Sequence, residues 1–473
     1  LELLWAMQPG LWDDAWTVLP AGAENLTVGV TYTYEWSGAL WDIWGLSEDE
    51  SVRHEFAPDD VIHLGYRPID ADRPGGGRKH SMYINDGSAA QDVDAAQMPD
   101  FWAVASDVAT AVENETWGHI KNRMNQRPWW HPDEFSARKP YLDARMSIIS
   151  AIRRFFAERN FAEVETPALQ ISPGIEPHLI AFETELTEPF RDGESRRLYL
   201  HTSPEFAMKK LLVAGQKRIY QLARCFRNAE RSGTHHPEFT MLEWYRVGTD
   251  YRALMADCEA LLRAVMAAVP ATSLVRGDKR SNPDAVWKYL TVAEAFQRDA
   301  GIDLLATAPD AGAPNAGLIR AEADRIGVFT SPSDSWEDVF FRIFLARIEG
   351  GLGIDAPTVL YDYPVSMAAL SRVKTDDPRL AERFELYASG LEIANAYSEL
   401  IDADEQRRRF KADVARKREL FGSAYPIDED FLAALDYGLP NCAGIALGVD
   451  RLVMLATGAS TIEDVLWAPV AAT

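Results

Sequence analysis

The chain has 473 residues, of which 47% are hydrophobic and 25% are charged, a composition that suits one large globular domain and a smaller one. Its formal net charge is −24. Because nucleic-acid binders usually carry a basic surface that neutralises phosphates, this charge disfavours a polyanionic partner.

The three cysteines, Cys225, Cys258 and Cys442, lie far apart and form no CxxC pair. So few cysteines predict a reducing compartment, the cytoplasm, and no structural zinc site. No apolar run reaches the roughly 18 residues of a membrane-spanning helix, and no basic start precedes an apolar stretch as in a signal peptide. We therefore expect no membrane partner.

The N-terminal part is strongly acidic, since residues 1–125 carry 7 Lys and Arg against 21 Asp and Glu. Alternating Val, Thr and Tyr predict a strand over 26–36, and apolar spacing predicts a helix over 101–122. Residues 125–140 contain three prolines and no sustained period, which predicts an extended linker. We predict an extension of unknown role, 1–128, and a second domain, 129–473.

The second domain opens with a helical pattern. Leu142, Met146, Ile149 and Phe156 recur at helical spacing and predict one apolar face on a helix that ends near Asn160. Residues 161–169 then form a short strand pattern that is stopped by a proline.

Two later pairs of segments have strand character. Residues 218–226 and 238–246 predict strands joined by a polar loop, 227–237. Residues 383–387 and 391–399 form a second pair, before a glycine-rich turn and a final helix over 450–457. Helices packed against a largely antiparallel sheet would follow, which is an α+β fold.

The polar loop carries the first group of candidate functional residues. Arg227, Arg231, His235 and His236 lie in it, with the aromatic Phe239 just beyond. Arginine grips phosphate bidentately and keeps its charge, so this group suits a polyphosphate and a stacked base.

A second group consists of Glu385, Glu392 and Glu399, at successive spacings of seven. If the two segments that carry them pair as adjacent strands, the carboxylates could share one surface. Carboxylates close to phosphates suit Mg²⁺, which takes only one or two protein oxygens. Any single member is more often part of a solvated face, so only the combination indicates a site.

Three stretches in order resemble the motifs of class II aminoacyl-tRNA synthetases. Residues 144–169 (ARMSIISAIRRFFAERNFAEVETPAL) resemble motif 1, 224–246 (RCFRNAERSGTHHPEFTMLEWYR) motif 2, and 444–455 (GIALGVDRLVML) motif 3. Residues 202–215 and 383–400 are most similar to lysyl-tRNA synthetases and, closer still, to their shortened paralogues, the elongation factor P β-lysine ligases. The resemblance covers 138–473 and implies a class II synthetase catalytic fold.

The resemblance also implies roles at the nucleotide end of the site. Arg227 would hold the ATP α-phosphate and the substrate carboxylate, Arg451 the γ-phosphate and His235 the phosphate tail. Phe239 would stack on adenine, with Arg451 covering the other side of the ring. Glu385 and Glu392 would hold Mg²⁺.

The implied amino-acid pocket takes a lysine-type substrate, with Glu399 facing its distal ammonium. An acidic end is physically sensible, because an unpaired buried ammonium is costly. The residues that would line this pocket are Ser203, Glu205, Glu243, Tyr245, Asn395, Glu399 and Ala446. The family commonly forms homodimers through motif 1, and transfers the amino acid from its adenylate to a lysine of elongation factor P.

Two positions depart from the synthetase pattern. Ala229 stands where motif 2 usually has glutamate, and either the adjacent Glu230 meets the adenine amino group or that contact is missing. Ala446 replaces the glycine of lysyl-tRNA synthetases, a change shared with the protein ligases. One methyl group in a pocket wall is worth roughly 1–3 kcal/mol of discrimination, enough to separate α- from β-lysine.

Two alternatives stay open on the sequence. The chain could be a lysyl-tRNA synthetase, although the acidic residues 1–125 do not resemble an anticodon-binding barrel and make tRNA an unfavourable partner. It could also be a catalytically silent regulatory paralogue, an alternative suggested by Ala229 at the glutamate position of motif 2. The presence of both motif arginines and both candidate metal carboxylates argues against this alternative.

Overall fold

The computed structural model describes residues 25–28, 61–65, 81–85, 128–187, 195–310 and 313–470. The chain divides into two units, Leu1–Gln126 and Arg127–Thr473. In the first unit, β1 (Asn25–Val28), β2 (Val61–Gly65) and β3 (Ser81–Asn85) pair as an antiparallel sheet. The strand predicted over 26–36 overlaps β1; its remainder and the helix predicted over 101–122 lie outside the described residues.

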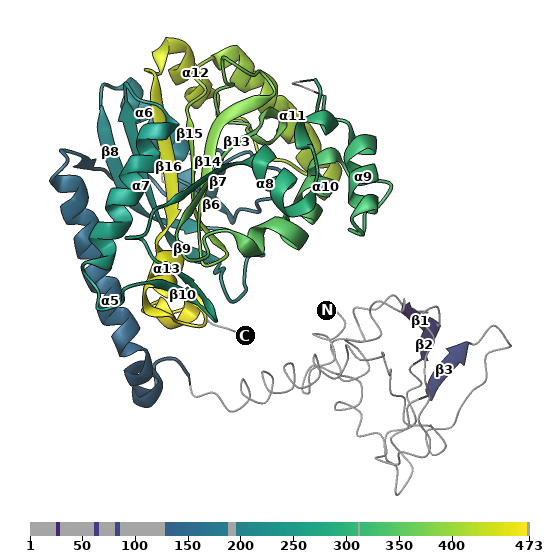
Figure 1. Ribbon diagram of the computed structural model, residues 1–473, viewed down its shortest axis with the longest axis horizontal. Helices are drawn as coiled ribbons and strands as arrows, with labels where there is room; N and C mark the ends of the chain where they lie inside the picture. Colours follow the sequence, from purple (N-terminus) through teal and green to yellow (C-terminus); the bar gives the residue numbers. More distant parts are fainter. Residues whose placement is uncertain are drawn as a thin grey trace, which may run out of the picture. The chain divides into compact units, whose positions relative to one another are not determined.

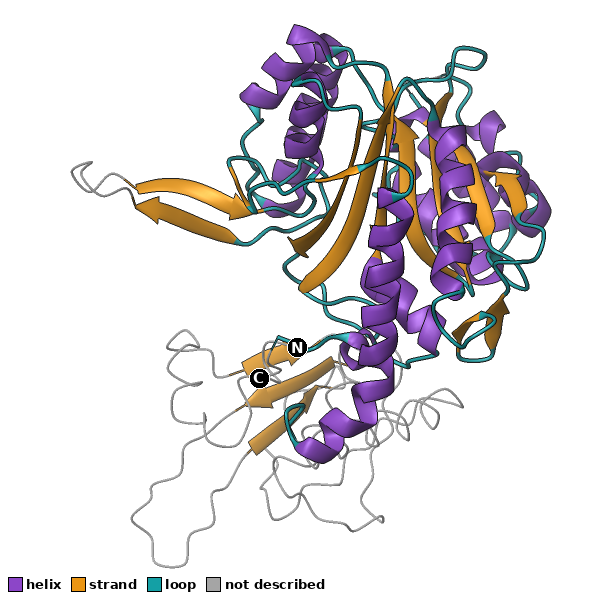
Figure 2. Cartoon of the chain, turned by 90° about the vertical axis from the view of Figure 1, so that its left-hand side faces the viewer, coloured by secondary structure: helices purple, strands orange, loops and turns teal. Residues whose placement is uncertain are grey.

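The second unit begins with a long helix, α5 (Pro132–Ala157), so the prediction of an extended linker up to residue 140 was wrong. Pro132 lies in the first turn, where its missing N–H costs nothing, and the His131 side chain accepts from the Asp133 N–H. Pro140 lies inside the helix, and Figure 2 shows a bend in the N-terminal part of α5. The predicted helix end near Asn160 is confirmed, because α5 stops at Ala157.

The predicted apolar face of α5 was partly wrong. Leu142 and Phe156 are buried as predicted, but Met146 is 49% exposed. Ile148, Ile152 and Phe155 complete the buried face. These side chains enter the core between α5 and the sheet.

The centre of the unit is a mixed sheet, antiparallel except at its two edges, where β12 pairs with β13 and β4 with β8 in parallel. Both predicted strand pairs are confirmed within a few residues. Residues 161–169, predicted as one short strand, contain only the strand Ala162–Glu163 and the first residue of the strand Leu169–Gln170. Within residues 128–470 the order across the sheet is β12 (Lys288–Thr291), β13 (Thr358–Pro364), β14 (Leu380–Ala388), β15 (Leu391–Ser398), β16 (Cys442–Gly448), β9 (Glu238–Val247), β8 (Arg218–Phe226) and β4 (Ala162–Glu163).

Three helices cover one face of this sheet: α5, α7 (Tyr251–Met266) and α13 (Val449–Thr457), with α5 and α7 side by side in Figure 1. They enclose the main core, in which Leu242 and Trp244 of β9 meet α7 and α13. Because side chains alternate along a strand, the neighbouring residues of β9, Glu243 and Tyr245, point to the opposite face.

The opposite face is flanked by two helix groups. The first packs against Tyr245 and consists of α6 (Glu205–Val213), α11 (Ala403–Phe421) and α12 (Glu429–Gly438). The second packs against Leu360 and Tyr387 and consists of α8 (Val292–Ala300), α9 (Ala316–Arg325) and α10 (Trp336–Ile343), with the short turns Leu304–Thr307, Phe344–Ile348 and Glu349–Gly351.

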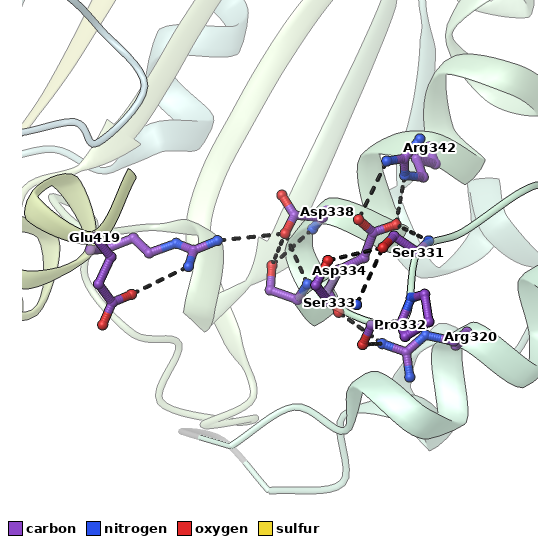
Figure 3. Close-up of polar contacts among 10 residues, drawn as sticks. Arg320, Ser331, Pro332, Ser333, Asp334, Asp338, Arg342 and Glu419 are labelled. Atoms are coloured by element: carbon purple, nitrogen blue, oxygen red, sulfur yellow. Dashed lines mark hydrogen bonds and ion pairs between the residues drawn. The ribbon is translucent and has the colours of Figure 1, made fainter. Parts of the chain in front are cut away.

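A polar network ties the second group to α11. Ser335 caps α10 and Asp338 accepts from it, while Arg416 of α11 lies 3.6 Å from the Asp338 carboxylate (Figure 3). Arg342 of α10 forms an ion pair at 2.8 Å with Asp334, which lies in the loop before α10. These contacts fix the outer helices that frame the site face.

The remaining elements lie at the periphery. A small sheet contains β5 (Leu169–Gln170), β6 (Glu183–Thr187) and β7 (Ser195–Leu200), and the β6–β7 hairpin projects from the unit in Figure 2. The other short elements are β10 (Leu274–Arg276), β11 (Lys279–Ser281), Val365–Met367 and Ile462–Val465. Among the described helices, none combines the length and apolarity that crossing a membrane requires.

Candidate active site

The strand registers gather four of the predicted site residues in one row. Glu243 of β9 pairs with Ala446 of β16, Ala446 with Asn395 of β15, and Asn395 with Glu385 of β14. Directly opposed residues on neighbouring strands share a face, so these side chains lie next to one another although they are far apart in sequence. Residues from motifs 2 and 3 meet here.

A second row of paired residues explains why position 444 is a glycine. Tyr245, Gly444, Tyr397 and Arg383 follow one another across the same four strands. A Cβ at Gly444 would lie 2.2 Å from the Tyr245 ring and 2.4 Å from Oε1 of Glu399. The missing side chain therefore makes the space that Glu399 occupies.

Glu392 reaches the same face only through a β-bulge. It lies seven residues before Glu399, and an odd spacing on a regular strand puts two side chains on opposite faces. The pairing shifts between Tyr387–Glu392 and Leu386–Ala394, which leaves Ile393 as the extra residue. Both candidate metal carboxylates and the pocket residues therefore share one face.

The amino-acid end of the site contains Glu243 in a buried hydrogen-bonded position. Ser203 Oγ donates to its Oε1 at 2.5 Å and Tyr245 Oη donates to its Oε2 at 2.9 Å. Burial, reinforced by the nearby Glu205, raises the pKa of Glu243 to about 8 against these two hydrogen bonds. The carboxyl group is thus poised to exchange a proton for a cation.

Lys209 is a pocket residue that the sequence analysis missed. Its Nζ lies 2.5 Å from Oε1 of Glu205 and 2.5 Å from Oε2 of Glu399, and Tyr397 Oη donates to Glu205 at 2.7 Å. Burial disfavours its ammonium, but the two carboxylates together raise the pKa of Lys209. The sequence feature that could have identified Lys209 is its position four residues after Glu205, because this spacing puts both side chains on one face of α6.

A pocket opens beside these residues, lined by Ser203, Glu205, Gly174 and Glu176 among others. Burial and the nearby Glu205 raise the pKa of Glu176. Lys417 of α11 donates to the carbonyls of Pro177 at 3.0 Å and Leu179 at 2.6 Å, and so holds the loop that carries Glu176. The pocket is therefore acidic on several sides.

At the nucleotide end, Arg227 lies over an aromatic ring. Its guanidinium is 5.1 Å from the Phe239 ring centroid, and its buried Nε has no hydrogen-bonding partner among the described residues. An unsatisfied buried donor is costly, which makes this group available to an anionic ligand. Ala229 follows in a left-handed conformation with φ 61°, where the Asn228 side chain accepts from its N–H.

Arg451 and His235 hold each other. Arg451 Nη2 lies 2.6 Å from His235 Nε2, and Arg451 also donates to the carbonyls of Glu392 at 2.9 Å and Thr234 at 3.3 Å. Burial and the adjacent Arg451 lower the pKa of His235, so the imidazole is neutral and can accept from the guanidinium. Two predicted phosphate ligands thus form one unit.

The two carboxylates assigned to a metal differ in their surroundings. Glu385 accepts from Tyr363 and Tyr387, each at 2.6 Å, and from Arg383 at 2.7 Å. Burial and the adjacent Glu385 raise the pKa of Glu392, whose Oε2 lies 3.8 Å from Arg451. A divalent cation would relieve this like-charge repulsion, and carboxylate oxygens are the ligands that Mg²⁺ prefers, so the donor chemistry fits the ion. To hold it, Glu385 would exchange one of its present hydrogen bonds for the ion.

Glu230 is the predicted residue least tied to the others. It is half-buried. Its negative charge favours a higher pKa of His235, but burial and Arg451 lower that pKa more strongly. Ala446, in contrast, packs with Met241 and Phe239, between the nucleotide and amino-acid ends.

A buried ion pair supports the nucleotide end from the other face of the sheet. Arg145 of α5 pairs with Asp450 of α13 and donates to Thr240 Oγ1 at 2.9 Å, while Asp450 accepts from the Thr240 N–H at 2.6 Å. Asp450 precedes Arg451 and Thr240 follows Phe239. The pair therefore joins all three motifs directly beneath the predicted ATP ligands.

Comparison with known proteins agrees with this geometry. Residues 134–471 match the model of the family described as tRNA synthetases class II (D, K and N). The chain belongs to this family, and the predicted class II synthetase fold is confirmed.

Within the family, three similar proteins from different bacteria carry the same name. The chain is 39% identical over 339 residues, 71% of its length, to an "Elongation factor P--(R)-beta-lysine ligase" of Vibrio parahaemolyticus, of which 96% is covered. It is 41% identical over 72% of its length to the protein of that name from Salmonella paratyphi B and 40% identical over 73% to that from Proteus mirabilis, with 98% and 99% of those proteins covered. The resemblance to elongation factor P β-lysine ligases is confirmed.

Proposed function

We propose that the chain is an ATP-dependent ligase that activates a lysine-type amino acid, (R)-β-lysine, as its aminoacyl-adenylate and transfers it to a lysine side chain of elongation factor P. The observation that carries the proposal is a sheet face on which the buried carboxylates Glu243 and Glu385 share one row, with the charges of Arg227 and Arg451 both acting on the neighbouring Glu392. The names of the relatives supply the β-isomer and the acceptor.

In the first step, a carboxylate oxygen of the amino acid attacks the α-phosphorus, a P–O bond forms, and the bond to the departing pyrophosphate breaks. Arg227 and Arg451 offer fixed positive charge where negative charge spreads, and the neutral His235 keeps Arg451 in place. Glu385 and Glu392 would hold Mg²⁺, which supplies further neutralisation of the phosphates. No covalent enzyme intermediate is required.

In the second step, the neutral amine of the acceptor lysine attacks the adenylate carbonyl carbon. A C–N bond forms, the bond to AMP breaks, and the amine releases a proton. For both steps together, we assign the nucleotide and its Mg²⁺ to Arg227, Glu230, His235, Phe239, Glu385, Glu392 and Arg451. We assign the amino acid to Ser203, Glu205, Glu243, Tyr245, Asn395, Glu399 and Ala446.

The arrangement of the whole protein is part of the proposal. We assign catalysis to residues 129–473, and homodimer formation to the motif 1 helix, which the 49% exposure of Met146 on α5 supports. A cytoplasmic location is consistent with three free cysteines, Cys225, Cys258 and Cys442, all buried.

Amino-acid-dependent exchange of pyrophosphate into ATP tests the first step. Lysine and (R)-β-lysine should support exchange, while norleucine, which lacks the distal ammonium, should not, because Oε1 of Glu399 would be left buried without a hydrogen-bond donor. Equal exchange with norleucine would remove Glu399 from the pocket, and absence of exchange with every amino acid would favour the silent paralogue.

A further inference from the structure

Lys209 is a buried charge that the proposed chemistry does not use. Only 1% of its surface is exposed, and its ammonium bridges Glu205 on its own helix and Glu399 just beyond β15. A buried ammonium is retained only when it is paired, and this one is paired twice. Lys209 therefore links α6 to the strand that carries the predicted ammonium acceptor.

We propose that Lys209 is a positioning residue that holds one oxygen of Glu399, Oε2, and turns the other oxygen, Oε1, toward the distal ammonium of the substrate. The inference rests on the proposed function, because it takes Glu399 as that acceptor. Both carboxylate oxygens of Glu399 are buried without a hydrogen-bonding partner among the described residues. Oε2 forms an ion pair with Lys209 at 2.5 Å, which leaves Oε1 as the oxygen that can take the substrate ammonium. Gly444 leaves Oε1 the room it needs.

The charge balance of the pocket supports this role. Burial raises the pKa of Glu399, and the nearby ammonium of Lys209 opposes the increase. Without Lys209, neighbouring carboxylates would share protons, and a protonated Glu399 would no longer attract an ammonium. The titratable groups facing Glu399 are Glu205 and Lys209 of α6, Glu243 and Tyr245 of β9, Tyr397 of β15 and Cys442 of β16.

Lys209 thus selects for substrates with a charged tail without touching the reacting atoms. A role in packing alone would affect charged and neutral substrates equally. A role as a competitor for the ammonium site would make its removal strengthen lysine binding. The three roles predict different results for the same variants.

The test measures binding of lysine to the full chain by calorimetry, together with KM values for lysine and ATP in pyrophosphate exchange. Lys209→Met and Lys209→Gln should weaken lysine binding by about tenfold or more at about pH 8, because Oε1 of Glu399 is no longer held in place. The affinity should also level off at a higher pH than in the unaltered protein, because loss of the neighbouring cation raises the pKa of Glu399 further. The KM for ATP should stay within about twofold. Lys209→Arg, which keeps the charge, should restore most of the affinity.

Lys210→Met is the matched control. Lys210 is the next residue of α6, is only partly buried, and pairs with Asp428 and Asp430 away from the pocket. This variant should bind lysine within about twofold of the unaltered protein. The preference for lysine over norleucine should fall by about tenfold in the two neutral Lys209 variants and not in the control.

The outcomes separate the two proposals. If the unaltered protein binds neither lysine nor (R)-β-lysine, the proposed function and the role of Lys209 both fail. If it binds lysine and a folded neutral variant binds lysine equally or more tightly at every pH, only the role of Lys209 is overturned. Thermal unfolding establishes folding, and the Gln variant, which keeps a polar side chain, decides the matter if the Met variant does not fold.

Discussion

The two ends of the site are built differently. At the amino-acid end, Glu399 and Lys209 are 0% and 1% exposed; Lys209 lies in α6, and Glu399 directly follows β15. At the nucleotide end, Arg227, His235 and Arg451 are half-buried, and His235 lies in the loop between β8 and β9. Burial makes charge expensive at the first end, whereas exposure leaves the second end accessible to a large polyanion.

This difference predicts that the amino-acid end determines substrate specificity and that the nucleotide end determines the rate of adenylation. A rigid, desolvated pocket discriminates between side chains, because an unmatched group leaves a buried charge unpaired. Arginines with spare donors act on the charge that develops at phosphorus. Changes at the amino-acid end should therefore alter KM for the amino acid, and changes at the nucleotide end should alter turnover and KM for ATP.

The largest effect is expected beneath the nucleotide end. Arg145→Met leaves Asp450 buried without its cation, and breaking a buried pair costs about 3–5 kcal/mol of the free energy of unfolding. Urea or thermal unfolding measures it. Arg153→Met on the same helix removes an exposed pair with Glu163 and should cost less than about 1 kcal/mol; equal losses would show that the buried pair has no special role.

Loss of Arg451 should abolish most adenylation. Arg451→Ala removes one fixed cation from the phosphate end, which predicts a fall in turnover of about 10²–10³ with the fold intact. Pyrophosphate exchange and circular dichroism measure both quantities. The exposed Arg408 of α11 gives a control, Arg408→Ala, with unchanged exchange; normal turnover in Arg451→Ala would refute the motif 3 assignment.

Glu399→Gln tests the role of the amino-acid end. It keeps the shape and removes the charge, so lysine binding should weaken by about 2–3 kcal/mol, while KM for ATP changes little. Steady-state exchange kinetics separate the two constants. An unchanged KM for lysine, or an equal rise in both constants, would place the ammonium elsewhere.

Lysine binding should depend on pH because the acidic end takes up protons. The pKa of Glu243 is raised to about 8, so below that pH the free protein holds a proton that the substrate ammonium must displace. Affinity should rise with pH, by at most about tenfold per unit, and level off above about 8. Calorimetry in buffers of different ionisation enthalpy detects the released proton; a constant affinity between about pH 6 and 8 contradicts this account.

The smallest effect concerns Glu230. Glu230 is half-buried and Ala229 takes the usual glutamate position, so Glu230→Gln should change KM for ATP by no more than about threefold. A rise of about 30-fold would instead show that Glu230 serves as the adenine contact. Exchange kinetics at varied ATP give the answer.

The sequence predicted the elements whose patterns are local. The strand over 218–226 matches β8 residue for residue, and the final helix differs from α13 at one residue. The linker prediction failed because proline in the first helical turn and proline in a loop look alike in a sequence. His131 and Pro132 together were the overlooked start signal.

The site depended on information that is not local. The face that Glu392 shares with Glu399 follows from the bulge at Ile393, and pairing registers cannot be read from one strand. Lys209 was overlooked because a lysine on a helix is usually solvated, and only the approach of Glu399 from β15 reveals its role. The motifs supplied the candidates, and the register supplied their arrangement.

The most direct test of the proposed function is the intact mass of elongation factor P after incubation with the protein, Mg·ATP and either (R)-β-lysine or α-lysine, with charging of lysine tRNA measured in parallel. The account predicts that the factor gains the mass of one lysyl unit, more readily with the β-isomer, and that the tRNA stays uncharged. Charged tRNA beside an unmodified factor would contradict it and identify a tRNA synthetase instead.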